Sequence, residues 1–357
     1  MRYLEACDNI PAPRSSHPPH RTLLRDRRPY QEHFARHKPI RSGPHPTMSD
    51  SEVLTLVVLC QWRQDRSERA FLAYANRHLR SFFPHLLHQS AFNRRTRDLM
   101  GVLCALAPAI RQRATAVLGL PPPVLEAVDG VPVPLMARCR GRQHRLFRDE
   151  AAFGRGGSDK DWYYGLKLLV AVDDMSFIGG FVAGPANTEE RWLAEALFRW
   201  RLDPDLPAPT SNDMAQVLGP THRKGGRRQG PTGPLGPHWG VGVPSSPFII
   251  GDLNYEGTAW NQHWRDHYGA PVLTEADFRG LDKPDRRRAA RQLHGLRQCV
   301  ENAFSRLVAS FGLKFPRART LWGLWTRLAA KMGAHNLSLF LNLLYGRPLL
   351  STCDPLS

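Results

Sequence analysis

The fold class is decided by residues 124–129 (Val-Leu-Glu-Ala-Val-Asp) and residues 166–172 (Leu-Lys-Leu-Leu-Val-Ala-Val). Both are short runs of β-branched and aliphatic side chains, a composition that predicts β-strands. A third run at 177–182 follows a turn at 173–176. Because no helical stretch separates the second strand from the third, these runs predict an antiparallel meander.

Helices and strands alternate after this meander. Apolar residues at helical spacing predict helices over about 188–201, 257–268 and 284–312, with strands at 247–252 and 271–273 between them. The order β-β-β-α-β-α-β-α departs from the repeating βαβ units of a Rossmann fold. We therefore expect an α/β fold with a mixed sheet and flanking helices.

A small helical domain over 48–120 is expected to precede the sheet. Ser49 and Glu52 fit a capping box at the start of its first helix, and further helices are predicted over about 68–83 and 97–117. The triple proline at 121–123 ends this region.

Two other segments have unusual composition. Residues 1–47 hold eight prolines and nine Lys or Arg, and are interpreted as a basic leader, mostly disordered or preceding the true start of the protein. In 204–247, 17 of 44 residues are Pro or Gly, which favours a flexible basic insertion over a domain. The last predicted helix, about 321–345, is apolar but carries Arg327 and Lys331, so it is expected to pack on protein.

The chain is strongly basic, with 49 Lys and Arg against 32 Asp and Glu and a formal net charge of +17. Such a charge favours a polyanionic partner, nucleic acid first and an anionic membrane surface second, although the Arg-rich proteome of a high-GC organism gives the same composition. The six cysteines include no C-x-x-C pair, which argues against a zinc site and fits a reducing cytoplasm. No run of 18 apolar residues is present, so a cytoplasmic protein is expected.

Three acids lie at positions that suggest chemistry: Asp129 and Asp252 at the ends of predicted strands, and Glu301 in the long helix. Three converging carboxylates without His or Cys select Mg²⁺ or Mn²⁺. Each acid also has a structural interpretation. Asp129 fits a turn, Asp252 a helix cap, and Glu301 an ion pair with Arg297 four residues earlier.

Four stretches resemble one family: Val-Asp-Gly-Val-Pro-Val (128–133), Trp-Tyr-Tyr-Gly-Leu-Lys-Leu (162–168), Ile-Ile-Gly-Asp-Leu-Asn-Tyr (249–255) and Arg-Gln-Cys-Val-Glu-Asn-Ala-Phe-Ser-Arg-Leu (297–307). In order and spacing they resemble the DDE transposases of bacterial insertion sequences, whose catalytic domain has the RNase H-like fold of retroviral integrases. Residues 49–56 and 319–339 also resemble the terminal helices of the family, so the resemblance covers about 48–345, interrupted by 204–247. It implies an RNase H-like catalytic domain at 121–318. It further implies that the segment 319–357 consists of a C-terminal helix on that domain and a tail.

The resemblance implies that Asp129, Asp252 and Glu301 are the catalytic and metal-binding triad, holding two Mg²⁺ ions for which Mn²⁺ can substitute. It places Tyr255 and Arg297 near the DNA phosphates. The chain departs from many relatives at His294, Val308 and Leu253-Asn254, which bears on how DNA ends are handled. The basic residues that lead into the last helix are expected to line the DNA path, or else to form a solvated helix face: Lys283, Arg286, Arg287, Arg288 and Arg291.

The expected function is therefore metal-dependent DNA strand cleavage and strand transfer at the ends of an insertion sequence. The expected partners are double-stranded DNA, both terminal inverted repeats and target, and a second copy of the chain, with no role for a membrane. Residues 48–120 are expected to help recognise the repeats. Two alternatives remain open: a decayed copy that binds DNA without cutting it, and another RNase H-like nuclease such as a junction resolvase.

Overall fold

The computed structural model describes residues 46–63, 65, 67–143, 146–156, 161–218, 231–237 and 248–351. The predicted leader lies almost wholly outside the described residues, as does much of the Gly- and Pro-rich segment 204–247. Within that segment the structure describes helix α10 (Ser211–Leu218) and a β-bridge between Gly236 and Ala183. Part of the predicted insertion is therefore ordered against the sheet.

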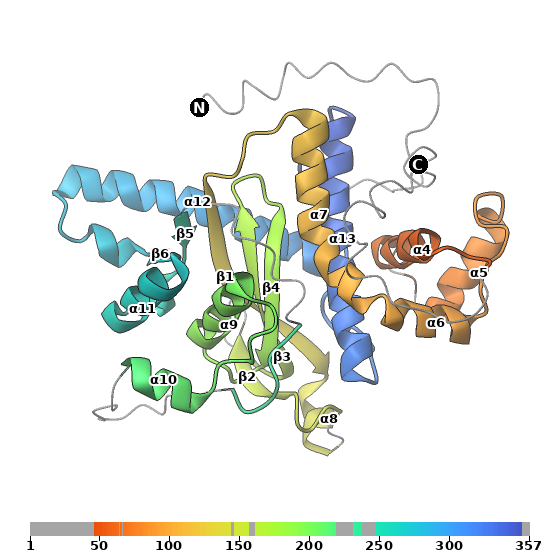
Figure 1. Ribbon diagram of the computed structural model, residues 1–357, viewed down its shortest axis with the longest axis horizontal. Helices are drawn as coiled ribbons and strands as arrows, with labels where there is room; N and C mark the ends of the chain where they lie inside the picture. The colour runs from red at the N-terminus through yellow and green to blue at the C-terminus, as the bar shows by residue number, and fades with distance from the viewer. Residues whose placement is uncertain are drawn as a thin grey trace.

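The core of the fold is a mixed six-stranded sheet (Figure 1). Strand β1 (Leu125–Met136) pairs antiparallel with β3 (Asp161–Asp173), which pairs antiparallel with β4 (Ile178–Pro185). The predicted meander is confirmed, with one addition: β2 (Ala152–Gly156) pairs with the first part of β3. On the other side of β1, β5 (Phe248–Ile250) and β6 (Val272–Leu273) run parallel to it.

Strand β1 is longer than predicted, and Asp129 lies inside it rather than at its end. Strand β1 continues through Pro132 and Pro134, although proline lacks the N–H that a central strand needs. Strand β5 pairs only with 125–127 of β1, so among the described strands the rest of β1 has no neighbour on that side. Proline is tolerated at such an edge.

Helices cover both faces of the sheet (Figure 1). Alternate side chains of β3 point to opposite sides, as a two-residue period requires. Val170 joins a core with α12 (Lys283–Ala309), α13 (Leu321–Leu344) and the helical region, whereas Leu169 joins a core with α9 (Glu190–Leu202) and α11 (Thr258–Tyr268). The result is a three-layer α/β arrangement.

The N-terminal helical region shares its core with the sheet. Its helices are α4 (Asp50–Arg63), α5 (Glu68–His78), α6 (Gln89–Asp98) and α7 (Met100–Leu118). Helix α13 packs along α7 and against α4, so the C-terminal segment joins this region to the sheet (Figure 1).

The predicted capping box is present. The amide of Ser49 donates to Glu52 Oε2 at 2.6 Å, and the amide of Glu52 donates to Ser49 Oγ at 3.3 Å. Helix α6 was not predicted, because Phe92 and Thr96 are its only buried side chains and give little periodicity.

Short elements complete the described part of the chain: α8 (Arg138–Gln143), the 3₁₀ turn η2 (Leu253–Tyr255) and the 3₁₀ turn η3 (Glu275–Phe278). Among the helices described, none combines the length and the apolar character needed to cross a membrane.

A buried ion pair fastens α9 to β1. Arg201 Nη1 and Nη2 lie 2.8 and 2.9 Å from the two carboxylate oxygens of Glu126, and both side chains are almost completely buried. Gly179 leaves room for this carboxylate, since a Cβ there would lie 2.2 Å from Glu126 Oε1. The pair anchors the last turn of α9 to β1, while the apolar side chains of α9 pack in one core with Val128 of β1. Together these contacts dock α9, whose first turn carries Glu190, on the strand that carries Asp129.

Replacing Arg201 by Met is expected to lower the free energy of unfolding by about 3–5 kcal/mol, because it leaves the Glu126 carboxylate buried without its cation. The matched control is Arg279→Met, which removes a similar two-bonded pair with Glu256 that is largely exposed. This control should cost no more than about 1 kcal/mol. Urea denaturation of both variants checks the difference, and equal losses would contradict it.

Candidate metal centre

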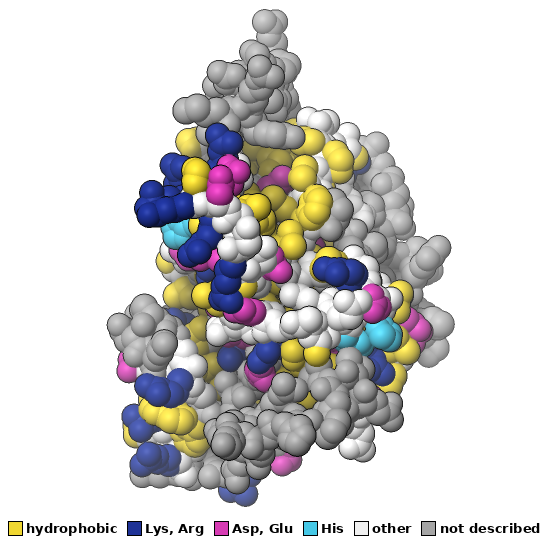
Figure 2. Space-filling model, turned by 90° about the vertical axis from the view of Figure 1, so that its left-hand side faces the viewer, with side chains coloured by type: hydrophobic (Ala, Val, Ile, Leu, Met, Phe, Trp, Pro, Cys, Tyr) yellow, Lys and Arg dark blue, Asp and Glu magenta, His cyan; other side chains and the backbone are white. Residues whose placement is uncertain are grey.

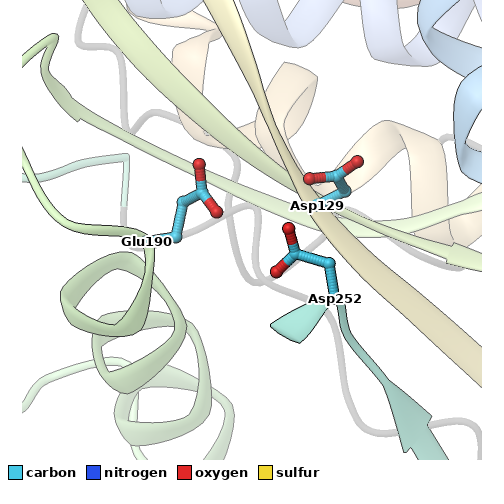
Figure 3. A group of neighbouring side chains, drawn as sticks. All are labelled: Asp129, Glu190 and Asp252. Carbon is cyan, nitrogen blue, oxygen red and sulfur yellow. The ribbon is translucent and has the colours of Figure 1, made fainter. Parts of the chain in front are cut away.

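Three carboxylates from three separate elements meet beside the sheet. Asp129 lies in β1, Asp252 lies two residues after the end of β5, and Glu190 is the first residue of α9. One oxygen of each lies within 4.8 Å of the others, and the three side chains point toward one another (Figure 3). The structure thus brings together two of the three predicted acids.

The strand geometry explains why Asp129 and Asp252 meet. Strand β5 runs parallel to β1, with Ile250 opposite Ala127, so the residues that follow on both strands continue in the same direction. Asp252 is also the N-cap of η2, and its Oδ1 accepts the amide of Asn254 at 2.8 Å. The side-chain amide of Asn254 donates to Asp252 Oδ2 at 2.8 Å, which fixes the carboxylate.

Glycine at position 130 allows Glu190 to reach the other two acids. Gly130 follows Asp129 and faces α9, and a Cβ built on it would lie 2.8 Å from Glu190 Oε1. Any side chain at this position would push Glu190 away. The backbone amide of Gly130 also donates to Asp129 Oδ1 at 2.7 Å.

Two cations partly balance the three acids. Lys167 Nζ of β3 lies 3.4 Å from Glu190 Oε1. Arg297 of α12, which is half-buried, lies close enough to lower the pKa of Asp129 by its charge. Negative charge therefore remains in excess, as a cation site requires.

The raised pKa values around the cluster show that its ionised form is electrostatically unfavourable. Burial raises the pKa of Asp129 to about 7, and repulsion from Glu190 and Asp252 adds to the rise against the opposing effects of the Gly130 amide and Arg297. Burial and the same three acids raise the pKa of Tyr255 well above its usual range. Burial, with help from Glu190, also raises the pKa of Tyr163. A bound cation would relieve this repulsion.

The donor set fits a hard divalent cation. It consists of carboxylate oxygens, with no His or Cys among the grouped residues. Oxygen-only sites favour Mg²⁺, Mn²⁺ or Ca²⁺ over zinc. Each of the three residues could supply one oxygen to such an ion.

Glu301, the third acid expected from the sequence, is exposed on α12 and is not one of the three grouped acids. Its role as a ligand stays a prediction. Sequence reasoning missed Glu190, because a glutamate in the first turn of a helix is explained by the helix dipole alone. The available signal was Gly130, which marks a close approach next to Asp129.

The predicted DNA-contacting residues occupy two environments. Tyr255 is fully buried against Gly251, so its ring supports the turn that carries Asp252 and is not presented at the surface. The basic residues of the first turns of α12 are all exposed: Lys283, Arg286, Arg287, Arg288 and Arg291. Figure 2 shows several Lys and Arg side chains close together on one face of the molecule.

Comparisons with known proteins identify no relative, because the chain matches no family model, no curated protein and no solved structure.

The raised pKa of Asp129 predicts how stability depends on pH in metal-free protein. The folded state retains a proton up to about pH 7 that the unfolded chain releases near pH 4, so stability falls as pH rises between these values. Asp129→Asn removes this loss of stability, because asparagine has no carboxyl proton to release. The variant is expected to match wild type near pH 4 and to exceed it by roughly 2–4 kcal/mol at pH 8.

Denaturation in chelator across pH 4–8 measures this difference. Asp266→Asn is the control, because Asp266 is exposed and accepts hydrogen bonds from Gln262, one turn earlier in its own helix. A constant offset between wild type and Asp129→Asn at all pH values would contradict the raised pKa.

Proposed function

We propose that this protein is a DNA transposase of an insertion sequence, which cleaves and joins DNA strands with the help of divalent metal ions. The observation that carries the proposal is the group of three carboxylates, Asp129, Asp252 and Glu190, held within 4.8 Å of one another. The same site would serve a different nuclease, so the choice of transposase rests on the sequence resemblance.

The topology supports an RNase H-like fold as part of the proposal. Four strands joined by antiparallel pairing are followed by two strands parallel to the first, with helices on both faces. The acids on β1 and after β5 fall on the stretches that resemble the family. A net charge of +17 fits a DNA substrate.

In this proposal Asp129, Asp252 and Glu190 hold Mg²⁺, one ion or two, with Mn²⁺ as a substitute. Bound there, such ions stabilise the attacking and leaving oxygens of a phosphodiester. The residues of the chain position these ligands: Asn254 fixes Asp252, and Lys167 holds Glu190. Asp129 gives up its proton when a cation binds, because its pKa of about 7 reflects burial and repulsion that the cation offsets.

The DNA would approach along α12. Arg297 lies close enough to act on Asp129 by its charge, and the exposed cations of the first turns extend the positive surface along the same helix. Their role is to neutralise phosphates and set the position of the strand. We further propose that two copies act together on two element ends, with residues 48–120 contacting the terminal repeats.

The third acid is the point at which geometry and resemblance differ. Glu190 reaches Asp129 and Asp252 in the structure, whereas the resemblance names Glu301, one helical turn beyond Arg297 and exposed. We propose Glu190 as the ligand, and matched amide variants of both residues decide between them.

The test is nicking of a labelled duplex that carries the element end, with Mg²⁺ and with EDTA. Wild-type protein is expected to cleave only with Mg²⁺. Asp252→Asn and Glu190→Gln are each expected to slow cleavage by more than about 100-fold, since even residues that only orient a metal ligand are worth 10–100-fold. Glu301→Gln should cleave at a rate near that of wild type.

A second pair of variants keeps every carboxylate. Gly130→Ala should also slow cleavage, because the added Cβ displaces Glu190, whereas Gly101→Ala should not, because a Cβ there meets nothing within 4 Å. Loss of cleavage in Glu301→Gln with full activity in Glu190→Gln would reverse the assignment of the third acid. Tight DNA binding by a folded protein that never cleaves would identify a DNA-binding relic.

A further inference from the structure

A second candidate site lies away from the acids, where the N-terminal helices meet the segment between α12 and α13. It is a cavity of about 550 Å³, lined by residues of α4, by the starts of α5 and α6, by loop 311–319 and by α13. The volume is within the range of small-molecule sites. In Figure 1 this region lies on the right, beside the lower part of α13.

The cavity is positively charged. Five cationic and two acidic side chains line it. Both acids are already engaged: Glu68 accepts from Arg327 and Asn93, and Asp65 pairs with Arg63. These two carboxylates therefore compete little with an anionic ligand for the remaining cations of the cavity.

Two exposed cations of the lining, Lys314 and Arg319, have no hydrogen bond or ion pair with any described residue. A third cation, Lys331, is buried and donates to the carbonyl of Phe311. Burial lowers the pKa of Lys331 to about 8, so it remains mostly charged at neutral pH.

Loop 311–319 exposes the ring of Phe315, and its backbone is strained. Phe315 and Arg317 both have a backbone φ of 56°, a left-handed conformation that costs a non-glycine residue about 1 kcal/mol or more. The amide of Phe315 donates to the carbonyl of Pro134 at 2.9 Å, which fixes the loop to the end of β1. The Phe315 side chain is nevertheless 48% exposed and lines the cavity.

Helix ends add to the positive potential. Ser67 is the N-cap of α5, Gln89 is the first residue of α6, and Arg319 directly precedes the N-cap of α13, Thr320. Ser67, Gln89 and Arg319 all line the cavity. The N-terminus of a helix carries partial positive charge, so these three ends favour an anion there.

We propose that this cavity binds an unpaired nucleotide of a DNA strand, with Phe315 stacked on its base and Lys314 and Arg319 on its phosphates. An exposed aromatic ring between cations is the arrangement by which proteins bind single strands. A cavity of this size admits one nucleotide and not a duplex. The proposal takes DNA as ligand from the proposed function, but it does not require cleavage.

The experiment measures binding by the full chain, in EDTA, of a labelled duplex with a single-stranded thymine overhang and of the same duplex with blunt ends. Phe315→Leu is expected to weaken overhang binding by about 5- to 100-fold, the range for losing one stacked base, and to leave blunt binding unchanged. Phe315→Trp, which keeps an aromatic ring, should bind as wild type does. Binding of the overhang should quench the fluorescence of the tryptophan introduced at position 315.

The charge test uses Lys314→Ala with Arg319→Ala. Each phosphate contact on a single strand contributes about 0.7 to the slope of log affinity against log salt concentration. Removing two contacts should therefore reduce this slope for overhang binding by about 1.4. Arg347→Ala is the control, because Arg347 is an exposed arginine just beyond the opposite end of α13, roughly 36 Å along that helix.

Three results would overturn the proposal: unchanged overhang affinity in Phe315→Leu, an equal effect of Arg347→Ala, or displacement of the overhang by polyglutamate as readily as by an oligonucleotide of the same charge. Thermal melts confirm folding of each variant. Because no metal is present, a failure here is distinct from a failure of the acid cluster to support cleavage.

Discussion

The attachment of α9 to β1 through Arg201 and Glu126 is the interaction on which the candidate site depends. Asp129 belongs to the strand and Glu190 to the helix, so their separation is set by how the two elements dock. A buried ion pair stabilises little compared with apolar packing, but separating its partners is costly because each charge would stay buried alone. The docked helix places its first turn beside Gly130, where the absence of a side chain leaves Glu190 room to approach.

Holding three carboxylates together costs the metal-free protein stability. Their repulsion and burial raise the pKa of Asp129 to about 7, which is the sign expected of a site completed by a cation. The neighbouring residues limit this cost without cancelling it, since Lys167 and Arg297 supply two positive charges against three negative ones. The cluster and the basic face of α12 thus complement each other, one suited to metal ions and the other to phosphates.

Periodicity was enough to predict the meander, the long helix that carries Arg297, and the capping box at Ser49, because each depends on neighbours close in sequence or on one repeated pattern. The position of Asp129 was harder. The predicted strand ended at Asp129, and only the pairing of β1 shows that it continues through Pro132 and Pro134, along the edge that β5 leaves open. Glu190 could not be predicted from spacing, since 61 positions separate it from Asp129 and only the packing of α9 brings them together.

The central claim is that Asp129, Asp252 and Glu190 form one divalent-cation site. Crystals of the protein grown or soaked with Mn²⁺ test it most directly, because the anomalous scattering of Mn²⁺ locates the ion independently of any assay. We expect an anomalous peak within coordinating distance of all three carboxylates, about 2.0–2.6 Å for hard cations on oxygen. A peak bound by Glu301 and not by Glu190, or no peak at the cluster in a well-ordered crystal, would contradict it.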